Sequence, residues 1–211
     1  METEPRHISS NEILYVLLPD FAAHEVVYLS QAVASDEFAL KTTPKYVNKI
    51  VAPTIAPVRS IGGFRTLPDY SFETMPDDYA ALILIGGFGW SMPVADKVTP
   101  IIRNAIERGK IVGAICNAAS FMAKCGFLNA VRHTGNGPDQ LKLWGGESYT
   151  NHAGYVHAQA VSDSNIVTAN GSATLEFARE LLLLLENDTP ERIEMYYQFN
   201  KQGFCTLFPQ N

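Results

Sequence analysis

Residues 112–120, VGAICNAAS, join a short apolar run to a row of small residues that suit a helix, with Cys116 at the junction. The run 111–115 is apolar and partly β-branched and follows a basic turn that contains glycine, which predicts a fully buried strand. The helix starts directly after the cysteine, so the turn is very tight. Ala114 and Ala118 are small enough for strand and helix to approach each other, as a nucleophile elbow requires.

Cys116 is the candidate nucleophile. A thiol at a helix N-terminus faces unsatisfied backbone N–H groups and the positive end of the helix dipole, and both favour the thiolate. We therefore expect the pKa of Cys116 to be lowered. The alternative is that Cys116 is one more small buried hydrophobic residue, as free cysteines often are.

The composition limits the class of protein. With 211 residues, 46% of them hydrophobic, the chain is long enough for one α/β domain and short for two, so we expect a core over 13–187 and a tail over 189–211. A net charge of −6 without a Lys/Arg cluster argues against nucleic acid as a partner.

The cysteines and the apolar runs indicate the compartment. The three cysteines form no CxxC pair, so we expect neither a disulfide framework nor a metal site, and a reducing cytoplasm fits best. The apolar runs are shorter than a membrane span, and no signal-peptide pattern precedes them. We expect a cytoplasmic protein without a membrane partner and without a cofactor.

Strands and helices alternate along the chain. Strands are expected at 13–18 and 79–85, and apolar residues at helical spacing predict helices at 22–34 and 98–108. This order predicts an α/β fold with a doubly wound, mostly parallel sheet of flavodoxin-like type, covered by helices on both sides. Further strands are expected at 38–43, at two places within 47–58, at 65–67, and as a hairpin at 155–161 and 166–169; another helix follows 170–173.

Two further features follow strand ends, where ligand sites of open parallel sheets gather. Glu25 lies in the first turn of the expected helix 22–34, so it could meet Cys116; the alternative is an acid that complements the helix dipole. Gly86 and Gly87 follow the strand 79–85, and their N–H groups could form an oxyanion hole with the N–H of Asn117. The alternative for the glycine pair is a plain turn.

Two polar loops, 132–138 and 144–152, could supply further polar groups. His133, His152 and His157 lack tight metal-ligand spacing, and a lone histidine is more often a packing or surface residue. The tail is rich in aromatic residues, so we expect it to dock on the body of the protein or on a second subunit.

Together these segments resemble the ThiJ/PfpI (DJ-1) superfamily within the class I glutamine amidotransferase-like fold. The segments that carry the resemblance are LLPDFAAHE at 17–25, ALILIGGFGW at 81–90, AICNAAS at 114–120, RHTGN at 132–136 and AVSDSNIVTANGSATLEFARELL at 160–182. The chain is most similar to bacterial members described as intracellular proteases or amidases.

The resemblance implies roles for particular residues. Cys116 would be the nucleophilic or oxidisable cysteine, Glu25 the acid that hydrogen-bonds its sulfur, and Gly87 and Asn117 oxyanion donors. Protease-like members have a histidine directly after the cysteine, where this chain has Asn117, and glutamine amidotransferases have a late His-x-Glu that is absent near residue 170. Both departures argue against peptidase and glutaminase activity.

The family's loop histidine leaves one assignment open. Many members carry Thr-Thr-His after the elbow helix; by spacing, that histidine falls near Asn136, with His133 three places earlier. His133, His152 or Asn136 could therefore assist Cys116.

Two functions remain open. One is a hydrolase, lyase or amidase-like enzyme for small carbonyl compounds or amides, with Cys116 attacking and His133 or His152 transferring protons. The other is a non-enzymatic redox or stress-response protein whose Cys116 is oxidised. The partner would be a small-molecule substrate or an oxidant, and family habit and the aromatic tail suggest a homodimer.

Overall fold

The computed structural model describes residues 10–34 and 45–209. Its main sheet has seven strands in the order β5-β2-β1-β6-β7-β9-β8. All pairs are parallel except β8 and β9, which form the expected antiparallel hairpin, although its first strand runs over 160–163 and not over 155–161. The strands are β1 (Glu12–Val16), β2 (Val47–Ala52), β5 (Tyr70–Ser71), β6 (Ala81–Leu84), β7 (Ile111–Ile115), β8 (Ala160–Asp163) and β9 (Ile166–Ala169). The mostly parallel α/β fold is confirmed.

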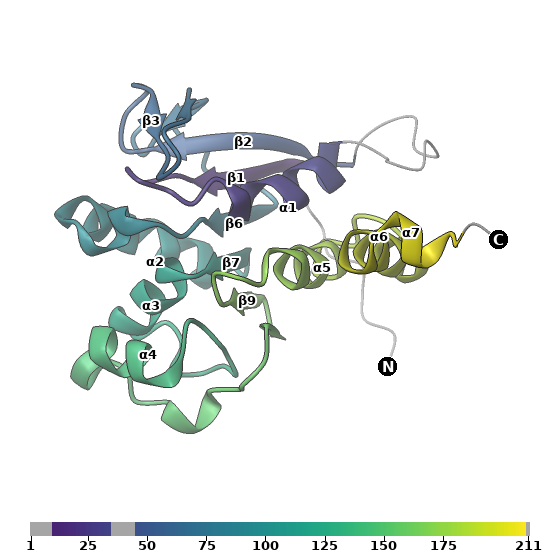
Figure 1. Cartoon of the computed structure of the whole chain (residues 1–211). Helices are drawn as coiled ribbons and strands as arrows, with labels where there is room; N and C mark the ends of the chain where they lie inside the picture. Colours follow the sequence, from purple (N-terminus) through teal and green to yellow (C-terminus); the bar gives the residue numbers. More distant parts are fainter. Residues whose placement is uncertain (1–9, 35–44, 210–211) are drawn as a thin grey trace.

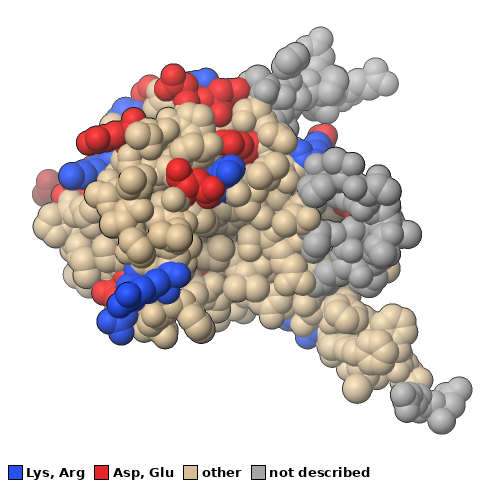
Figure 2. Space-filling view, turned by 90° about the horizontal axis from the view of Figure 1, so that it is seen from above, with Lys and Arg blue, Asp and Glu red and all other residues tan. Residues whose placement is uncertain are grey.

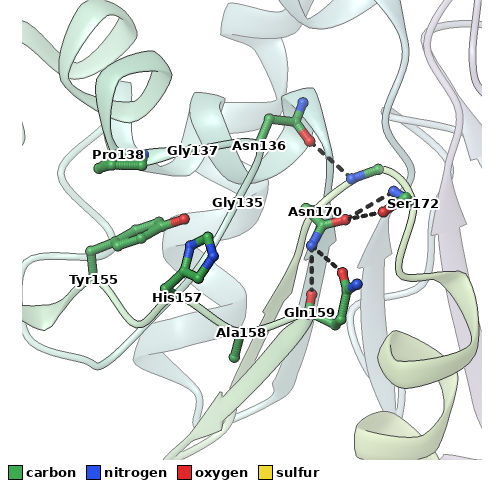
Figure 3. A pocket seen from close by; sticks show the side chains of 11 residues that line it. Gly135, Asn136, Gly137, Pro138, Tyr155, His157, Ala158, Gln159, Asn170 and Ser172 are labelled. Carbon is green, nitrogen blue, oxygen red and sulfur yellow. Dashed lines mark hydrogen bonds between the residues drawn. The ribbon is translucent and has the colours of Figure 1, made fainter.

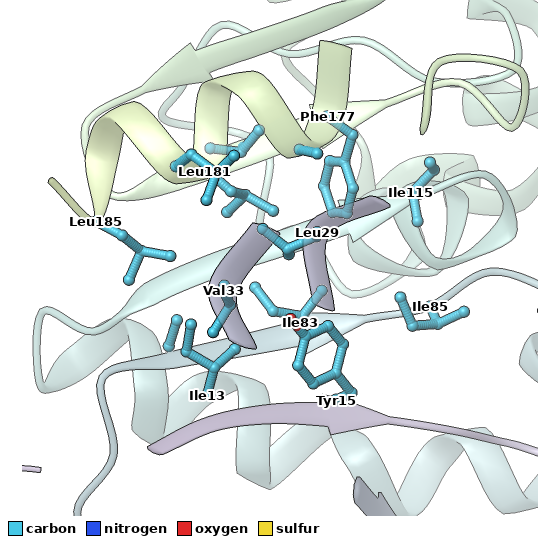
Figure 4. Close-up of a cluster of buried hydrophobic side chains, with 14 of the residues drawn as sticks. Ile13, Tyr15, Leu29, Val33, Ile83, Ile85, Ile115, Phe177, Leu181 and Leu185 are labelled. Carbon is cyan, nitrogen blue, oxygen red and sulfur yellow. The ribbon is translucent and has the colours of Figure 1, made fainter. Parts of the chain in front are cut away.

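Helices cover both faces of this sheet (Figure 1). On one face lie α1 (His24–Ala34) and α5 (Thr174–Leu184), with α6 (Pro190–Gln202) packed on α5. On the other lie α2 (Thr99–Glu107) and α3 (Asn117–Lys124), with α4 (Pro138–Gly145) packed on α3. Strand β1 shows why two layers are needed, because its alternate residues enter two different apolar clusters. Ile13 and Tyr15 pack with Leu29 of α1 and Phe177 of α5 (Figure 4).

Smaller elements surround the sheet. Strands β3 (Val58–Arg59) and β4 (Arg65–Thr66) form a short antiparallel hairpin. Strand β4 lies within the strand expected at 65–67, and β3 begins at the last residue of the range 47–58, where two strands were expected. The edge strand β5 was not predicted, and the expected strand 38–43 lies outside the described residues. The remaining short elements are η1 (Phe88–Ser91), η2 (Pro93–Val98), η3 (Gly146–Ser148), η4 (His152–Gly154) and α7 (Phe204–Leu207).

The aromatic tail docks on the body through α6, as predicted. The hydroxyl of Tyr196 donates to the carbonyl oxygen of Tyr28 in α1, and the hydroxyl of Tyr197 donates to Glu176 in α5. Farther along, the rings of Phe204 and Phe208 are exposed and pack on each other at 5.0 Å between centroids.

Charged side chains of both signs share the face seen in Figure 2, where the blue residues stand in small groups among red ones. Within residues 10–34 and 45–209, none of the helices combines the length and apolarity that crossing a bilayer requires.

Candidate active site

Cys116 lies at the sharp bend between β7 and α3. Its backbone has φ 60° and ψ −127°, a conformation that is strained for a residue with a side chain and that gathers at functional sites. Ala114 and Ala118 on either side of the bend are fully buried, and the cysteine itself is half-buried. The predicted nucleophile elbow is therefore present.

Glu25 reaches the elbow from the first turn of α1. The residue is 2% exposed, and its carboxyl group shares a hydrogen bond with the sulfur of Cys116 and accepts the N–H of Gly86 at 2.7 Å. A Cβ on Gly86 would lie 2.6 Å from both Glu25 Oε2 and Cys116 Cβ. The acid and the thiol can meet only because residue 86 is a glycine.

Two amides complete the surroundings of the sulfur. The backbone N–H of Asn117 donates to Sγ, and Asn136 Nδ2 donates to it from 3.3 Å. The side chain of Asn136 is held in place because its Oδ1 accepts the N–H of Gly171 at 2.9 Å. Among the described residues, the hydrogen-bond partners of the sulfur are Glu25, Asn117 and Asn136.

The N–H groups of Gly86 and Gly87 have different hydrogen-bonding states. Gly86 was expected to offer its N–H to an oxyanion, but that N–H is bonded to Glu25, and this part of the prediction is wrong. In the described part of the chain nothing accepts the N–H of Gly87. Gly87 has φ 135°, and a Cβ there would lie 2.2 Å from the carbonyl oxygen of Asp20. The side chain of Asn117 anchors this turn through a 3.1 Å bond from Nδ2 to the carbonyl oxygen of Gly87.

The surroundings of Glu25 and Cys116 raise the pKa of both groups. Burial raises the pKa of Glu25 to about 7, against the bond from Gly86 and the charge of His24. Burial, and then the Glu25 carboxylate, raise the pKa of the Cys116 thiol, while the bonds from Asn136 and Asn117 lower it. The expected lowered pKa of Cys116 is wrong because desolvation and a neighbouring negative charge outweigh the backbone donors.

His133 is not part of this cluster. It is fully buried; its Nδ1–H donates to the carbonyl oxygen of Val131 at 2.9 Å, and its Nε2 accepts the hydroxyl of Tyr149 at 2.5 Å. His152 is exposed and packs against the ring of Tyr149 at 4.9 Å between centroids. Of the three open alternatives, the structure brings Asn136 to the sulfur, and His133 instead ties two loops together.

Burial lowers the pKa of His133, which predicts a pH dependence of stability. The folded state prefers the neutral ring, so below the unfolded value of about 6.5 the unfolded state binds more protons. We expect the free energy of unfolding of the wild type, relative to a His133→Gln variant, to fall as the pH drops below that value. Urea titrations of both proteins at several pH values measure this difference; a constant difference would contradict it.

Two residues of the site were missed in the sequence. His24 precedes Glu25, and its Nε2 lies 3.2 Å from the carbonyl oxygen of Gly171. A Cβ on Gly171 would lie 2.9 Å from the sulfur, so glycine is needed there too. Gly171 follows the end of β9 as Gly86 follows the end of β6. This matching position relative to a strand end is the sequence signal that could have identified Gly171 as part of the site.

A pocket of about 680 Å³ lies on the far side of Asn136 and Gly171 from the elbow (Figure 3), and Cys116 itself is not among its lining residues. Asn136 and Gly171, which surround Sγ, are also part of its wall. Its lining consists of Gly135, Asn136, Gly137, Pro138, Tyr155, His157, Ala158, Gln159, Asn170, Gly171 and Ser172. The volume suits a small molecule.

A strained cysteine at a sharp strand-to-helix bend, faced by a buried acid at the carboxyl edge of a parallel sheet, defines the class as an α/β protein with a cysteine elbow. The model of the DJ-1/PfpI family matches residues 11–184, and the chain belongs to this family.

Relatives agree with this assignment. The "Uncharacterized protease YdeA" of Bacillus subtilis is 36% identical over 193 residues, which cover 90% of this chain and 91% of the relative. A thiJ/pfpI family protein of Bacillus anthracis is 28% identical with a TM-score of 0.88, covering 96% of both chains. The DJ-1 superfamily protein Atu0886 of Agrobacterium tumefaciens is 32% identical with a TM-score of 0.79, covering 91% of this chain and 98% of that one.

Proposed function

We propose that the protein is a cysteine-dependent enzyme that adds the sulfur of Cys116 to the carbonyl carbon of a small substrate, with Glu25 transferring the proton. The single observation that carries this proposal is the contact between the thiol and a carboxyl group whose pKa is raised to about 7. A general base works best when its pKa lies near the operating pH, and Glu25 meets that condition without a histidine.

The addition step uses groups that are in place. Glu25, ionised above pH 7, accepts the thiol proton while the sulfur attacks. A bond forms between sulfur and carbon, and the electron pair of the C=O bond moves to oxygen. The N–H of Gly87, which has no acceptor among the described residues, stabilises that oxyanion, and the N–H of Asn117 joins it once the sulfur has given up its lone pair to carbon, until Glu25 returns the proton to the oxygen. The product of this step is a hemithioacetal, from which lyase or hydrolase chemistry proceeds.

Turnover of methylglyoxal and of simple amides tests this function. We expect consumption of the carbonyl compound by the wild type and by a Cys125→Ser variant, because Cys125 bonds to Thr99 and is not part of the site. Absence of turnover, and of any adduct on Cys116 by mass spectrometry, would contradict the proposal.

A second candidate is a redox sensor in which peroxide oxidises Cys116 to sulfenic and then sulfinic acid. The donors at Asn117 and Asn136 favour it, since both donate hydrogen bonds to the sulfur, and the sulfinic group that forms there carries negative charge. Oxidation of Cys116 by peroxide without any turnover would favour this second function.

A further inference from the structure

The pocket bordered by Asn136 and Gly171 has a wall without charged side chains. None of its lining residues is Lys, Arg, Asp or Glu, although the chain as a whole carries 38 such residues, 16 basic and 22 acidic. A pocket for a carboxylate or a phosphate usually places an Arg or Lys against the anion. The lining therefore selects for an uncharged ligand.

One side of the pocket is fixed by its own hydrogen bonds. Asn170 Nδ2 donates to Gln159 Oε1 at 2.6 Å, and Asn170 Oδ1 accepts both the hydroxyl and the N–H of Ser172, at 2.7 and 3.0 Å. These bonds hold three polar side chains in place before a ligand arrives (Figure 3). A wall that is already ordered costs little entropy on binding.

The opposite side of the pocket carries polar groups that could hydrogen-bond to a ligand. Tyr155 and His157 present their rings to the pocket, and within the part of the chain that the structure describes neither the Tyr155 hydroxyl nor the His157 ring nitrogens have a hydrogen-bond partner. A phenol and an imidazole both donate and accept hydrogen bonds. They match ligand hydroxyl groups, and their ring faces match the C–H groups between those hydroxyls.

Two helix starts near the pocket do not change this charge preference. Pro138 begins α4 and Ser172 lies just before α5, so both helices have positive dipole ends there. Each helix already carries an acid in its first turn, Asp139 in α4 and Glu176 in α5. In addition, the Cys116 and Glu25 pair becomes negative above pH 7 and repels an anion.

We propose that this pocket binds the uncharged, polyhydroxylated part of a sugar-like carbonyl compound and so presents its carbonyl carbon to Cys116. This inference rests on the proposed function for the chemistry at sulfur, but the pocket can be tested without any turnover. The probes are xylitol, a neutral polyol without a carbonyl group, and xylonate, its carboxylate counterpart.

The measurement is the rate at which iodoacetamide alkylates Cys116 in the full-length protein, read by mass spectrometry. A polyol of this size binds in the millimolar range at best. We expect saturating xylitol to slow the alkylation several-fold, and xylonate at the same concentration to leave it unchanged. Equal protection by both probes, or no protection by xylitol, would overturn the proposal.

Variants of the pocket make the test specific. Tyr155→Phe and His157→Ala should each raise the half-protecting xylitol concentration by roughly 5- to 10-fold, because each removes a hydrogen-bonding group. Gln159→Lys should add protection by xylonate, since it places a cation in the wall. Gln202→Lys, on the exposed end of α6, is the matched control and should behave as the wild type. Unchanged protection in all pocket variants would overturn the assignment.

The two proposals fail in different ways. If xylitol protects Cys116 but neither methylglyoxal nor simple amides are turned over and no adduct forms on Cys116, the pocket assignment stands and the enzymatic function is wrong. If methylglyoxal is consumed but xylitol does not protect, the enzymatic function stands and the polyol pocket is wrong.

Discussion

Replacing Cys116 by serine is expected to lower kcat/KM for methylglyoxal by at least about 10³-fold, the scale seen when a catalytic nucleophile is removed. A serine hydroxyl is far less acidic than a thiol, so Glu25, with a pKa of about 7, is too weak a base to activate it. The serine side chain is no larger than that of cysteine, so the melting temperature should stay close to that of the wild type.

Cys125→Ser is the matched control for this variant. Cys125 is half-buried like Cys116, but it lies at the end of α3 and bonds to Thr99 Oγ1 at 3.6 Å. The activity of the Cys125→Ser variant should stay within about 2-fold of the wild type, as expected for a small change away from the reacting atoms. Wild-type turnover in Cys116→Ser would show that the chemistry does not need this sulfur.

A Gly86→Ala variant is expected to lose about 2 kcal/mol or more of stability and most of its activity. The new Cβ would lie 2.6 Å from Cys116 Cβ, 2.6 Å from Glu25 Oε2 and 2.9 Å from the carbonyl oxygen of Ile115. The backbone contact cannot be relieved by a rotamer change, so the acid and the thiol must separate. Urea unfolding and methylglyoxal turnover measure the two losses.

Gly62→Ala is the control for this substitution. A Cβ at Gly62 has its nearest neighbour at 3.9 Å, which is an ordinary contact. The variant should therefore unfold and react like the wild type. If Gly86→Ala did so as well, the close approach of Glu25 and Cys116 would be wrong.

The sequence was sufficient for the parts of the site that follow from strand ends. A buried strand before Cys116, another before Gly86, and Glu25 in a first helical turn all belong at one edge of a parallel sheet. Because that edge is shared, residues far apart in the sequence could be expected to meet. The tight connection at Cys116 was also expected, but its positive φ was found only in the structure.

The contacts made by loop residues were less predictable, because loops lack the regular spacing of apolar residues that identifies helices and strands. His133 is fixed by Tyr149 and by the carbonyl oxygen of Val131, and nothing in the sequence pattern distinguishes that arrangement from one in which His133 faces the sulfur. Asn136 takes that place instead. The two-residue strand β5 is likewise too short to give a hydrophobic pattern.

The acidity of Cys116 could not be derived from sequence for a different reason. Its sign depends on a competition between helix donors, burial and a neighbouring carboxylate. The position after a strand shows the donors, but it does not show how deeply the sulfur and Glu25 are buried.

The pH dependence of iodoacetamide alkylation, compared between the wild type and Glu25→Gln, tests the central claim that the sulfur and the acid form one coupled pair. The side-chain amide introduced by this substitution keeps an acceptor for the N–H of Gly86 but carries no charge. We predict a wild-type midpoint above the value of about 8.5 for a free thiol, and a lower midpoint in Glu25→Gln, because the charge that raises the pKa of Cys116 is gone. The same midpoint in both proteins, or a wild-type midpoint below that of a free thiol, would contradict the account.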